Sequence, residues 1–574
     1  MFEGLQAIRK ELKEAKLENP DREEIHDGYQ LRFVGKDYAK FITGLPTETV
    51  LVPDTEWNNQ EQNKNSENIF ITGDNLDALK HLENAYSGRI KMIYIDPPYN
   101  TGSDGFVYND KFGFSEEQLK EKLGLTDVEV ARIKALEGKC SHSAWLTFML
   151  PRLAIAKRLL SDDGCIFISI DFNEVFNLRC LMNEIFGEQN FQREIVWRIG
   201  WLSGYKTTAS NYIRNHDSIM FYSKNNNQLD FIKKYIYNND FKPLVKNSDT
   251  NLTNKMKELG LNEKKQKELI DFINHTNRPE KYPLEDTWNC NEYDDLNSIA
   301  IVSFSGEKIS KMLNIDQDFK GQKSVKMLKR LLETTTKNND IILDFFAGTS
   351  STAHAVMEMN KEDGGNRKYI MVQLDEPTFE IKNGKKTAKK GSEAAFEAGY
   401  ESIDQISRDR IKKAAEQLGD TSGFKHYKLA KVENEKILDK IDNFNPDSKN
   451  LIADDMLKPF SGKSLNTTLT ATGTQTLLTT WLVDDGYALT TPVEEKKFGS
   501  YTAFIPEESH RLYLIDTGWN SDATKDLLNK IGKNELIVQS IVVYSHSFDF
   551  TSLTELKNNL RAVLSNDIKL IERF

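Results

Sequence analysis

The sequence lacks the features of a secreted, membrane-spanning or zinc-binding protein. Its 574 residues contain only four cysteines and no CxxC pair, so they suggest no metal site and fit a chain whose thiols stay reduced. No apolar run approaches the ~18 residues that a membrane span needs. The opening stretch, MFEGLQAIRKELKEAKLENPDREE, is charged and lacks the apolar core of a signal peptide. We therefore expect a cytoplasmic protein with no membrane partner.

An excess of positive charge is also absent, since the net charge is −11. That total does not exclude a polyanionic partner, because phosphate binding depends on the local field. One stretch, 193–246, is locally basic, with only Glu194, Asp217, Asp230 and Asp240 as acids. Its basic residues are Arg193, Arg198, Lys206, Arg214, Lys224, Lys233, Lys234, Lys242 and Lys246. We expect a basic surface there.

What the sequence does contain is an alternation of short apolar runs with helical patterns. This alternation is typical of an open α/β sheet with helices on both faces. Residues 143–164 are predicted to form an amphipathic helix that Pro151 interrupts and that ends near Gly164. The apolar runs that predict strands lie at 68–75, 91–99, 164–174, 339–346 and 367–377, with further strands expected near 193–200 and 216–224.

Changes in composition divide the chain into segments. The region 224–325 is rich in asparagine, lysine and aromatic residues and is interpreted as an inserted domain. A second polar passage, 417–450, is interpreted as a connector. The expected organisation is an N-terminal helical or extended segment at 1–64, the first half of an α/β domain at 65–223, the insert at 224–325, the second half at 326–416, a linker at 417–450 and a C-terminal α/β unit at 451–574.

The most unusual strand end is the tetrapeptide Asp96-Pro97-Pro98-Tyr99, which follows an apolar run directly. Two consecutive prolines stiffen the loop and remove two N–H donors, but their carbonyl groups can still accept hydrogen bonds. The plain alternative is a rigid end to the strand with a tyrosine on the surface. The loop thus offers hydrogen-bond acceptors and a flat ring.

A second strand end, Asp344 to Thr352, is rich in small and hydroxyl-bearing residues. Such a turn lets a ligand approach the backbone closely, with the N–H groups of the following helix aimed at it. An ordinary helix N-cap uses the same serine and threonine chemistry. No lysine follows Gly348, which excludes a phosphate-binding P-loop. Because ligands of open α/β sheets bind beyond the carboxyl ends of the strands, we expect both strand ends to form one site.

Together, the two strand ends provide what methylation of an amine requires. A flipped adenine can stack on Tyr99 while its amino group donates to the Asp96 carboxylate and the Pro97 carbonyl. These acceptors draw electron density onto the nitrogen and orient its lone pair toward a methyl donor. The reaction then depends on positioning and electrostatics, without a metal or a covalent nucleophile.

The motif DPPYNTG, with DFFAG some 250 residues downstream, resembles the β-class of AdoMet-dependent DNA amino-methyltransferases. In that class the catalytic half precedes the cofactor half, and a target-recognition domain lies between them. The runs FITGDNLDALKHL, SAWLTFMLPRLAIAKRLL, GCIFISIDFNE and GQKSVKMLKRLLETTT are similar to modification (Mod) subunits of type III restriction–modification systems. The resemblance covers roughly 65–415 and, more loosely, the C-terminal unit. It implies a Rossmann-like AdoMet-methyltransferase sheet with permuted motif order, an inserted target-recognition domain and a C-terminal α/β assembly unit.

The resemblance also implies roles for individual residues. It assigns catalysis to Asp96, Pro97, Pro98 and Tyr99. It assigns AdoMet binding to three strand ends, with Asp74, Asp344, Phe345, Phe346, Ala347, Gly348, Thr349, Gln373 and Asp375. Ser350 departs from the family pattern, which often has a second glycine there. Gln373 also departs, because many relatives carry an acid there for the ribose hydroxyls; Gln373, Asp375 or Glu376 can take that role.

The function implied is site-specific methyl transfer from AdoMet to N6 of a flipped adenine in duplex DNA. Cytosine N4 is the alternative target, but the family favours aspartate at the first tetrapeptide position for adenine and serine for cytosine, so Asp96 favours adenine. A catalytically silent DNA-recognition subunit is a third possibility, opposed by the intact DPPY. The implied partners are double-stranded DNA, a restriction (Res) subunit and a second copy of the chain.

Other polar and aromatic residues are expected to be structural. No histidine lies in a cluster with ligand spacing, and amine methylation needs no histidine base, so His142, His216 and His354 are interpreted as structural. The helically spaced Trp145, Phe148 and Met149 are expected in the core. Asp171, at another strand end, can line the cleft, although no motif requires it.

Overall fold

The computed structural model describes residues 30–101, 120, 126–137, 141–198, 212–246, 248–294, 296, 312–313, 323–389, 392–432, 456–563 and 568–574. The predictions for the helix-like N-terminal stretch, for Lys206 and for residues 433–450 of the linker lie outside these residues. The connector prediction is wrong for the described part of the linker, because residues 425–431 form a strand of the central sheet. No helix in the described part of the chain is long and apolar enough to cross a membrane.

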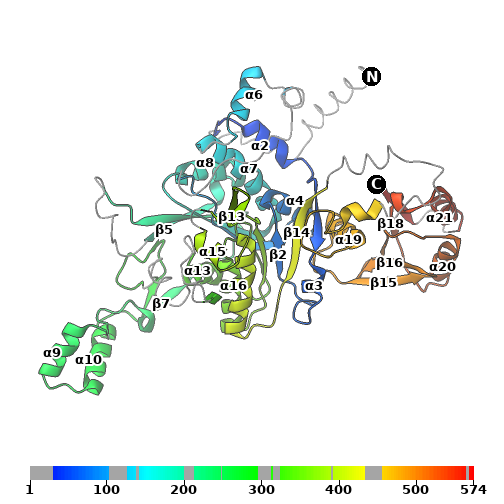
Figure 1. Ribbon diagram of the computed structural model, residues 1–574. Helices are drawn as coiled ribbons and strands as arrows, with labels where there is room; N and C mark the ends of the chain where they lie inside the picture. The colour runs from blue at the N-terminus through cyan, green and yellow to red at the C-terminus, as the bar shows by residue number, and fades with distance from the viewer. Residues whose placement is uncertain are drawn as a thin grey trace.

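A ten-stranded mixed sheet forms the centre of the molecule, in the order β1-β14-β2-β11-β10-β3-β4-β6-β5-β9 (Figure 1). Neighbouring strands from β14 to β4 are parallel. Antiparallel pairing joins β1 to β14, and β6 to both β4 and β5. The strands are β1 (Thr49–Pro53), β2 (Ile69–Thr72), β3 (Ile90–Ile95), β4 (Leu160–Ile170), β5 (Phe191–Arg198), β6 (His216–Ser223), β9 (Thr287–Trp288), β10 (Ile341–Asp344), β11 (Lys368–Gln373) and β14 (Lys425–Lys431).

Helices cover both faces of this sheet, so its central strands are buried on both sides. Successive side chains of a strand point to opposite faces; Ile93 and Ile95 therefore lie in one core, and Met92 and Tyr94 in the other. This double burial explains why the strands appear as continuous apolar runs in the sequence. The first core contains α4 (Asn75–Tyr86), α7 (His142–Leu159) and α8 (Val175–Phe186), and the second contains α13 (Val325–Thr335), α14 (Ser351–Asp363) and α16 (Ile403–Leu418).

These elements confirm the predicted α/β alternation and the predicted strands of the central sheet. The prediction for 143–164 is wrong in two respects. Helix α7 continues through Pro151, and it ends at Leu159, where Leu160 begins β4. A proline inside a helix removes one hydrogen bond. Twelve of the eighteen residues of α7 are buried, and this tertiary packing keeps the helix intact across the proline.

The chain between β6 and α13 leaves the sheet and forms a separate lobe. A two-stranded ribbon, β7 (Tyr235–Tyr237) with β8 (Lys281–Pro283), connects to a helical hairpin of α9 (Thr250–Glu258) and α10 (Glu263–His275). The hairpin projects away from the central sheet (Figure 1). Strand β9 then returns to the edge of the sheet beside β5.

A second, five-stranded sheet lies in the C-terminal part of the chain, in the order β15-β16-β17-β18-β19. Helix α19 (Gly473–Asp484) packs between the two sheets, since its Trp481 shares a core with Val52 of β1 and Tyr544 of β18. The strands and helices of this part of the chain confirm its predicted α/β character. The elements are β15 (Val493–Phe498), β16 (Tyr501–Pro506), β17 (Arg511–Leu514), α20 (Ser521–Gly532), β18 (Ser540–Tyr544), α21 (Phe550–Val563) and β19 (Lys569–Arg573).

Shorter elements complete the described structure. Helix α2 packs on α7, and the hairpin of β12 and β13 follows β11. The bounds are α2 (Lys36–Thr43), α3 (Thr55–Asn58), α6 (Asp127–Lys134), β12 (Phe379–Lys382), β13 (Lys385–Ala388) and α15 (Glu393–Glu397).

Candidate active site

The sheet order brings the two unusual strand ends together. Strands β3 and β10 are parallel neighbours, with Leu343 opposite Ile93. Their carboxyl ends therefore meet at one edge of the sheet, where Asp96 follows β3 and Asp344 ends β10. Strands β11 and β2 come next in the sheet and end at the same edge. The two strand ends therefore lie side by side, and that they form one site stays a prediction.

Asp96 of the DPPY tetrapeptide forms an ion pair with Lys323, which the sequence did not reveal. The Tyr99 hydroxyl donates to Asp96 Oδ1 at 2.8 Å. The Lys323 Nζ lies 3.1 Å from the same oxygen and donates to the Tyr99 hydroxyl at 2.5 Å. Burial and the Asp96 carboxylate raise the pKa of Tyr99 well above its ordinary value, so the phenol stays protonated. Lys323 lies just before α13, within the run GQKSVKMLKRLL.

The chain after Asp96 is fixed by side chains from two helices. Pro97 is buried, and the carbonyl of Pro98 accepts a hydrogen bond from Trp145 Nε1 at 2.7 Å. Asn100 Nδ2 donates to the buried Glu174 at 2.5 Å. Trp145 is fully buried, as the core prediction requires; its hydrogen bond to the catalytic loop had no signal in the sequence.

The loop between β10 and α14 is held by hydrogen bonds between the backbone of Gly348 and two side chains, Gln373 and Ser407. Gly348 has a φ of +52°, a conformation that glycine adopts at low cost. Its N–H donates to Gln373 Oε1 at 2.7 Å, and its carbonyl accepts from the Ser407 hydroxyl. Ser350 has a φ of +59°, so it takes a glycine-like conformation at a cost of about 1–2 kcal/mol. Although Ser350 departs from the family pattern, its backbone thus has a conformation typical of glycine.

Two buried side chains, Asp344 and Arg410, also form hydrogen bonds with this loop. Asp344 accepts hydrogen bonds from the Phe346 N–H at 3.0 Å and from Thr352 Oγ1 at 2.6 Å. Burial raises the pKa of Asp344 to about 7. The buried Arg410 donates to Thr349 Oγ1 at 3.0 Å. The sequence pointed to Asp344 and Thr349 but not to Arg410, which comes from α16.

The buried Asp344 predicts a specific dependence of stability on pH. Its pKa is about 7 in the folded chain, against an ordinary value of 3.8, so the folded state binds the proton more tightly and loses stability as pH rises between these values. The asparagine of Asp344→Asn cannot ionise and keeps an acceptor for the Phe346 N–H. The unfolding free energy of this variant minus that of wild type should therefore grow from pH 4 to 7, by on the order of 2–4 kcal/mol. Urea unfolding without cofactor measures this difference, and a difference independent of pH would contradict it.

The end of β2 is joined to the same loop. Asp74 caps α4 by accepting from the Leu76 N–H at 2.8 Å, and its other oxygen lies 3.2 Å from Arg152 Nη2. The next residue, Asn75, donates to the carbonyl of Phe345 at 2.9 Å. The strand ends of β2 and β10 are therefore hydrogen-bonded to each other.

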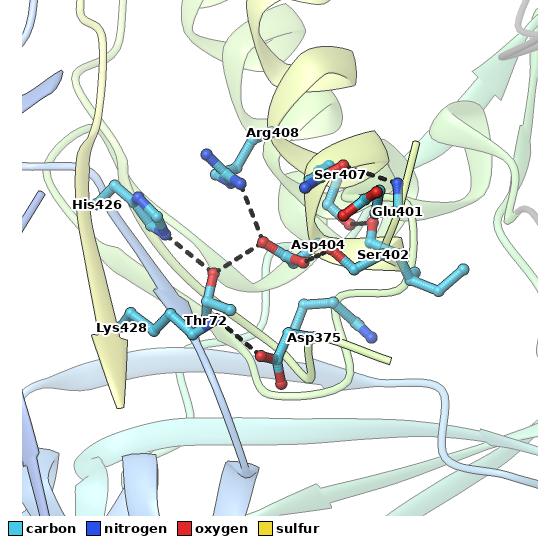
Figure 2. A network of polar contacts seen from close by, with 12 residues as sticks. Thr72, Asp375, Glu401, Ser402, Asp404, Ser407, Arg408, His426 and Lys428 are labelled. Atoms are coloured by element: carbon cyan, nitrogen blue, oxygen red, sulfur yellow. Dashed lines mark hydrogen bonds and ion pairs between the residues drawn. The ribbon is translucent and has the colours of Figure 1, made fainter. Parts of the chain in front are cut away.

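The three candidates for the ribose hydroxyls differ in their contacts. Gln373 uses its carbonyl oxygen to hold Gly348, and its amide donates to the Leu374 carbonyl at 3.2 Å. Asp375 forms an ion pair with Lys428 at 2.8 Å, and Figure 2 shows the two side chains turned toward each other. Glu376 has a looser partner, Lys389, at 3.7 Å.

A buried polar network lies beside this pair, around Thr72 at the end of β2 (Figure 2). The Thr72 hydroxyl lies 2.9 Å from His426 Nε2 and 3.2 Å from Asp404 Oδ2. Arg408 Nη2 lies 3.1 Å from the same Asp404 oxygen. Burial lowers the pKa of His426. The network links β2, β14 and α16 through side-chain contacts at this edge of the sheet.

The remaining candidates have structural partners. His142 Nδ1 lies 2.7 Å from Glu174 Oε1, and His354 Nε2 lies 3.2 Å from Glu358. Asp171 is buried and pairs with Arg214 at 2.9 Å. Within the described ranges, no group of three or more histidine, cysteine, aspartate or glutamate side chains could hold a metal ion.

Comparisons with known proteins show what the chain is similar to. A family model described as DNA methylase matches residues 90–384, and one described as the type III R-M EcoP15I C-terminal domain matches residues 472–570. The StyLTI Mod subunit of a type III restriction-modification enzyme from Salmonella typhimurium is 36% identical, and the match covers 96% of this chain and 91% of that protein. The EcoP15I Mod subunit from Escherichia coli is 34% identical over 93% of this chain and 89% of its own. The EcoPI Mod subunit of Escherichia phage P1 is 33% identical, with 93% and 90% covered.

Proposed function

This chain belongs to the family of Mod subunits of type III restriction–modification enzymes, and we propose that it methylates adenine at N6 within a specific sequence of duplex DNA. It is a DNA methyltransferase, and S-adenosyl-L-methionine (AdoMet) is its methyl donor. One observation carries the proposal of amine methylation, and aspartate at position 96 favours adenine over cytosine. Asp96 and Tyr99 follow β3 at the edge where the Gly348 loop follows the neighbouring strand β10.

At this edge, the chain's own groups can bind and orient a flipped adenine. The Asp96 carboxylate and the Pro97 carbonyl accept hydrogen bonds from the N6 amino group, and the ring of Tyr99 stacks on the base. Trp145 holds the neighbouring Pro98 carbonyl, which keeps the loop rigid. AdoMet supplies an electrophilic methyl group when bound. The site then accelerates transfer by positioning the amine and by stabilising charge on its nitrogen.

The loop after β10 fits AdoMet on two observations of its own structure. A Cβ at Gly348 would have no neighbour closer than the Phe346 carbonyl oxygen at 3.9 Å, so the backbone is open to a ligand there. The Ser350 hydroxyl is buried and has no hydrogen-bond partner among the described residues. We assign the cofactor to the residues that the family pattern named, namely Asp74, Asp344, Phe345, Phe346, Ala347, Gly348, Thr349, Gln373 and Asp375. Gln373 and Asp375 already have partners, but a carboxylate with one ion pair and an amide with one donated N–H can each bind a further hydroxyl, so the ribose can bind there without displacing them.

We propose that the lobe at 224–325 recognises the target sequence and that the basic stretch beside it contacts the DNA backbone. Lys233 and Lys246 are exposed, whereas Arg193, Arg214 and Lys224 already pair with aspartates. Contacts to phosphates release counterions, so affinity for DNA should fall steeply as salt rises. Binding that stays constant between low and physiological ionic strength would contradict this proposal.

We further propose that the C-terminal unit at 451–574 binds a restriction subunit and that the chain acts as a homodimer in the cytoplasm. A dimer suits a base-flipping enzyme, because one protomer can hold the duplex while the other extracts the base. Truncation near residue 445 should spare AdoMet binding and weaken assembly with the restriction subunit. A truncated chain that still binds that subunit, or an active strict monomer in light scattering, would contradict these proposals.

The most informative experiment on the DNA target is single-molecule sequencing of DNA from a host that expresses the chain. We expect modified adenines confined to one sequence motif. The matched control is a host that expresses Asp96→Asn, whose DNA should be unmodified. Modified cytosines in the wild-type host would favour the N4 reaction instead, and modified adenines scattered without a motif would contradict site-specific recognition.

A further inference from the structure

The side chains proposed to hold the target amine already contact another amine, that of Lys323. Lys323 Nζ lies 3.1 Å from Asp96 Oδ1 and 2.5 Å from the Tyr99 hydroxyl. The side chain of Lys323 is 11% exposed and that of Asp96 is 23% exposed, so the pair is largely shielded from water. Lys323 Nζ also lies 5.0 Å from the centroid of the Tyr99 ring. Lys323 therefore contacts both side chains that are to hold the adenine.

A lysine fixed in this position opposes methyl transfer. When the adenine amine attacks the methyl group, its nitrogen becomes positively charged before it loses a proton. A second cation beside that nitrogen raises the energy of this state through electrostatic repulsion. The ammonium group also contacts Asp96 Oδ1, an oxygen that can otherwise accept a hydrogen bond from the amine. Lys323 cannot remain there during the reaction.

We propose that Lys323 is a resting-state occupant of the amine site and that the amino group of the flipped adenine displaces it. This inference rests on the proposed function. Lys323 makes the binding of a base at this site selective. Asp96 becomes available only when the base replaces the charge-assisted hydrogen bond of the lysine and stacks on Tyr99. A free nucleoside, which lacks the DNA contacts that hold a flipped base in place, competes poorly with the lysine.

The test uses 2′-deoxyadenosine as a competitive inhibitor of DNA methylation by the full chain. Lys323→Met removes the ammonium group and keeps a side chain of similar length. Its inhibition constant for 2′-deoxyadenosine should fall about 10-fold, the effect of one charge-assisted hydrogen bond, while kcat on DNA stays at or above the wild-type value. Lys323→Gln should also lower the inhibition constant for 2′-deoxyadenosine and should not lower kcat on DNA. Agreement between the two variants excludes a folding defect in one of them as the cause.

Lys329→Met is the matched control, because Lys329 lies on α13 and pairs with Glu358 at 3.2 Å, away from the tetrapeptide. It should leave the inhibition constant unchanged. An unchanged inhibition constant in Lys323→Met would overturn the proposal, and so would a kcat on DNA that falls 10-fold, since the lysine would then take part in the reaction. Failure of the proposed function is distinguishable, because the wild-type chain would then fail to methylate adenine in DNA in the reference assay.

Discussion

Asp96→Asn should lower methyl transfer on the order of 10²-fold or more, the usual effect of a lost transition-state hydrogen bond. Asparagine is nearly the same size but carries no charge, so it draws less electron density onto the nitrogen of the adenine amine and does not stabilise the positive charge that develops there. The fold should persist, because Asp96 is bonded only to Tyr99 and Lys323 among the contacts described. Single-turnover kinetics with saturating AdoMet measures this effect.

Two changes at Tyr99 separate stacking from hydrogen bonding. Tyr99→Ala removes the ring and should cause a loss similar to that of Asp96→Asn. Tyr99→Phe keeps the ring and removes only the hydroxyl that donates to Asp96, so most of the activity should remain. Near-normal turnover in Asp96→Asn would refute the assignment of this carboxylate to the amine.

Gly348→Val should abolish measurable AdoMet binding in calorimetry while the chain stays folded. Gly348 has a φ of +52°, which a β-branched residue adopts only with strain. The valine side chain would also fill the space in which the backbone is open to the cofactor. The same change distorts the hydrogen bonds that Gly348 makes with Gln373 and Ser407. Gly348→Ala should give a smaller loss, since it adds one methyl group.

Gly384→Val is the matched control for backbone strain. Gly384 has a φ of +74° in the turn between β12 and β13, and a Cβ there would meet no atom within 4 Å. The valine is therefore similarly strained but lies outside the proposed site. It should leave AdoMet affinity unchanged. Equal losses of affinity in both variants would indicate a general effect of strain and would remove the Gly348 loop from the cofactor site.

The fold was predictable from the sequence because its central strands are buried on both faces. Runs such as Ile93–Ile95 and Ile341–Leu343 are short, apolar and followed by polar loops, a pattern that few other structures share. The meeting of the two strand ends was predictable as well, because parallel strands of one sheet end at a common edge. The continuous course of α7 through Pro151 was not predictable, since it depends on packing from other elements.

The residues that contact the tetrapeptide from afar in the sequence were missed for a different reason. Lys323 lies 224 residues from Tyr99 in the sequence, and Trp145 lies 47 residues from Pro98. Periodicity and motif spacing report neighbours along the chain, so they carry no signal for such pairs. Trp145 fitted the core pattern of its helix, and that prediction was correct. The hydrogen bond from its indole N–H to the Pro98 carbonyl could be found only from the tertiary structure.

The most direct test of the central claim is to follow the methyl group itself. The purified chain is incubated with unmethylated plasmid and AdoMet that carries a tritiated methyl group, and the DNA is then hydrolysed to nucleosides and separated. The account predicts label in N6-methyl-2′-deoxyadenosine, and none above background with Asp96→Asn. Label in N4-methyl-2′-deoxycytidine, or no label in DNA with the wild-type chain, would contradict it.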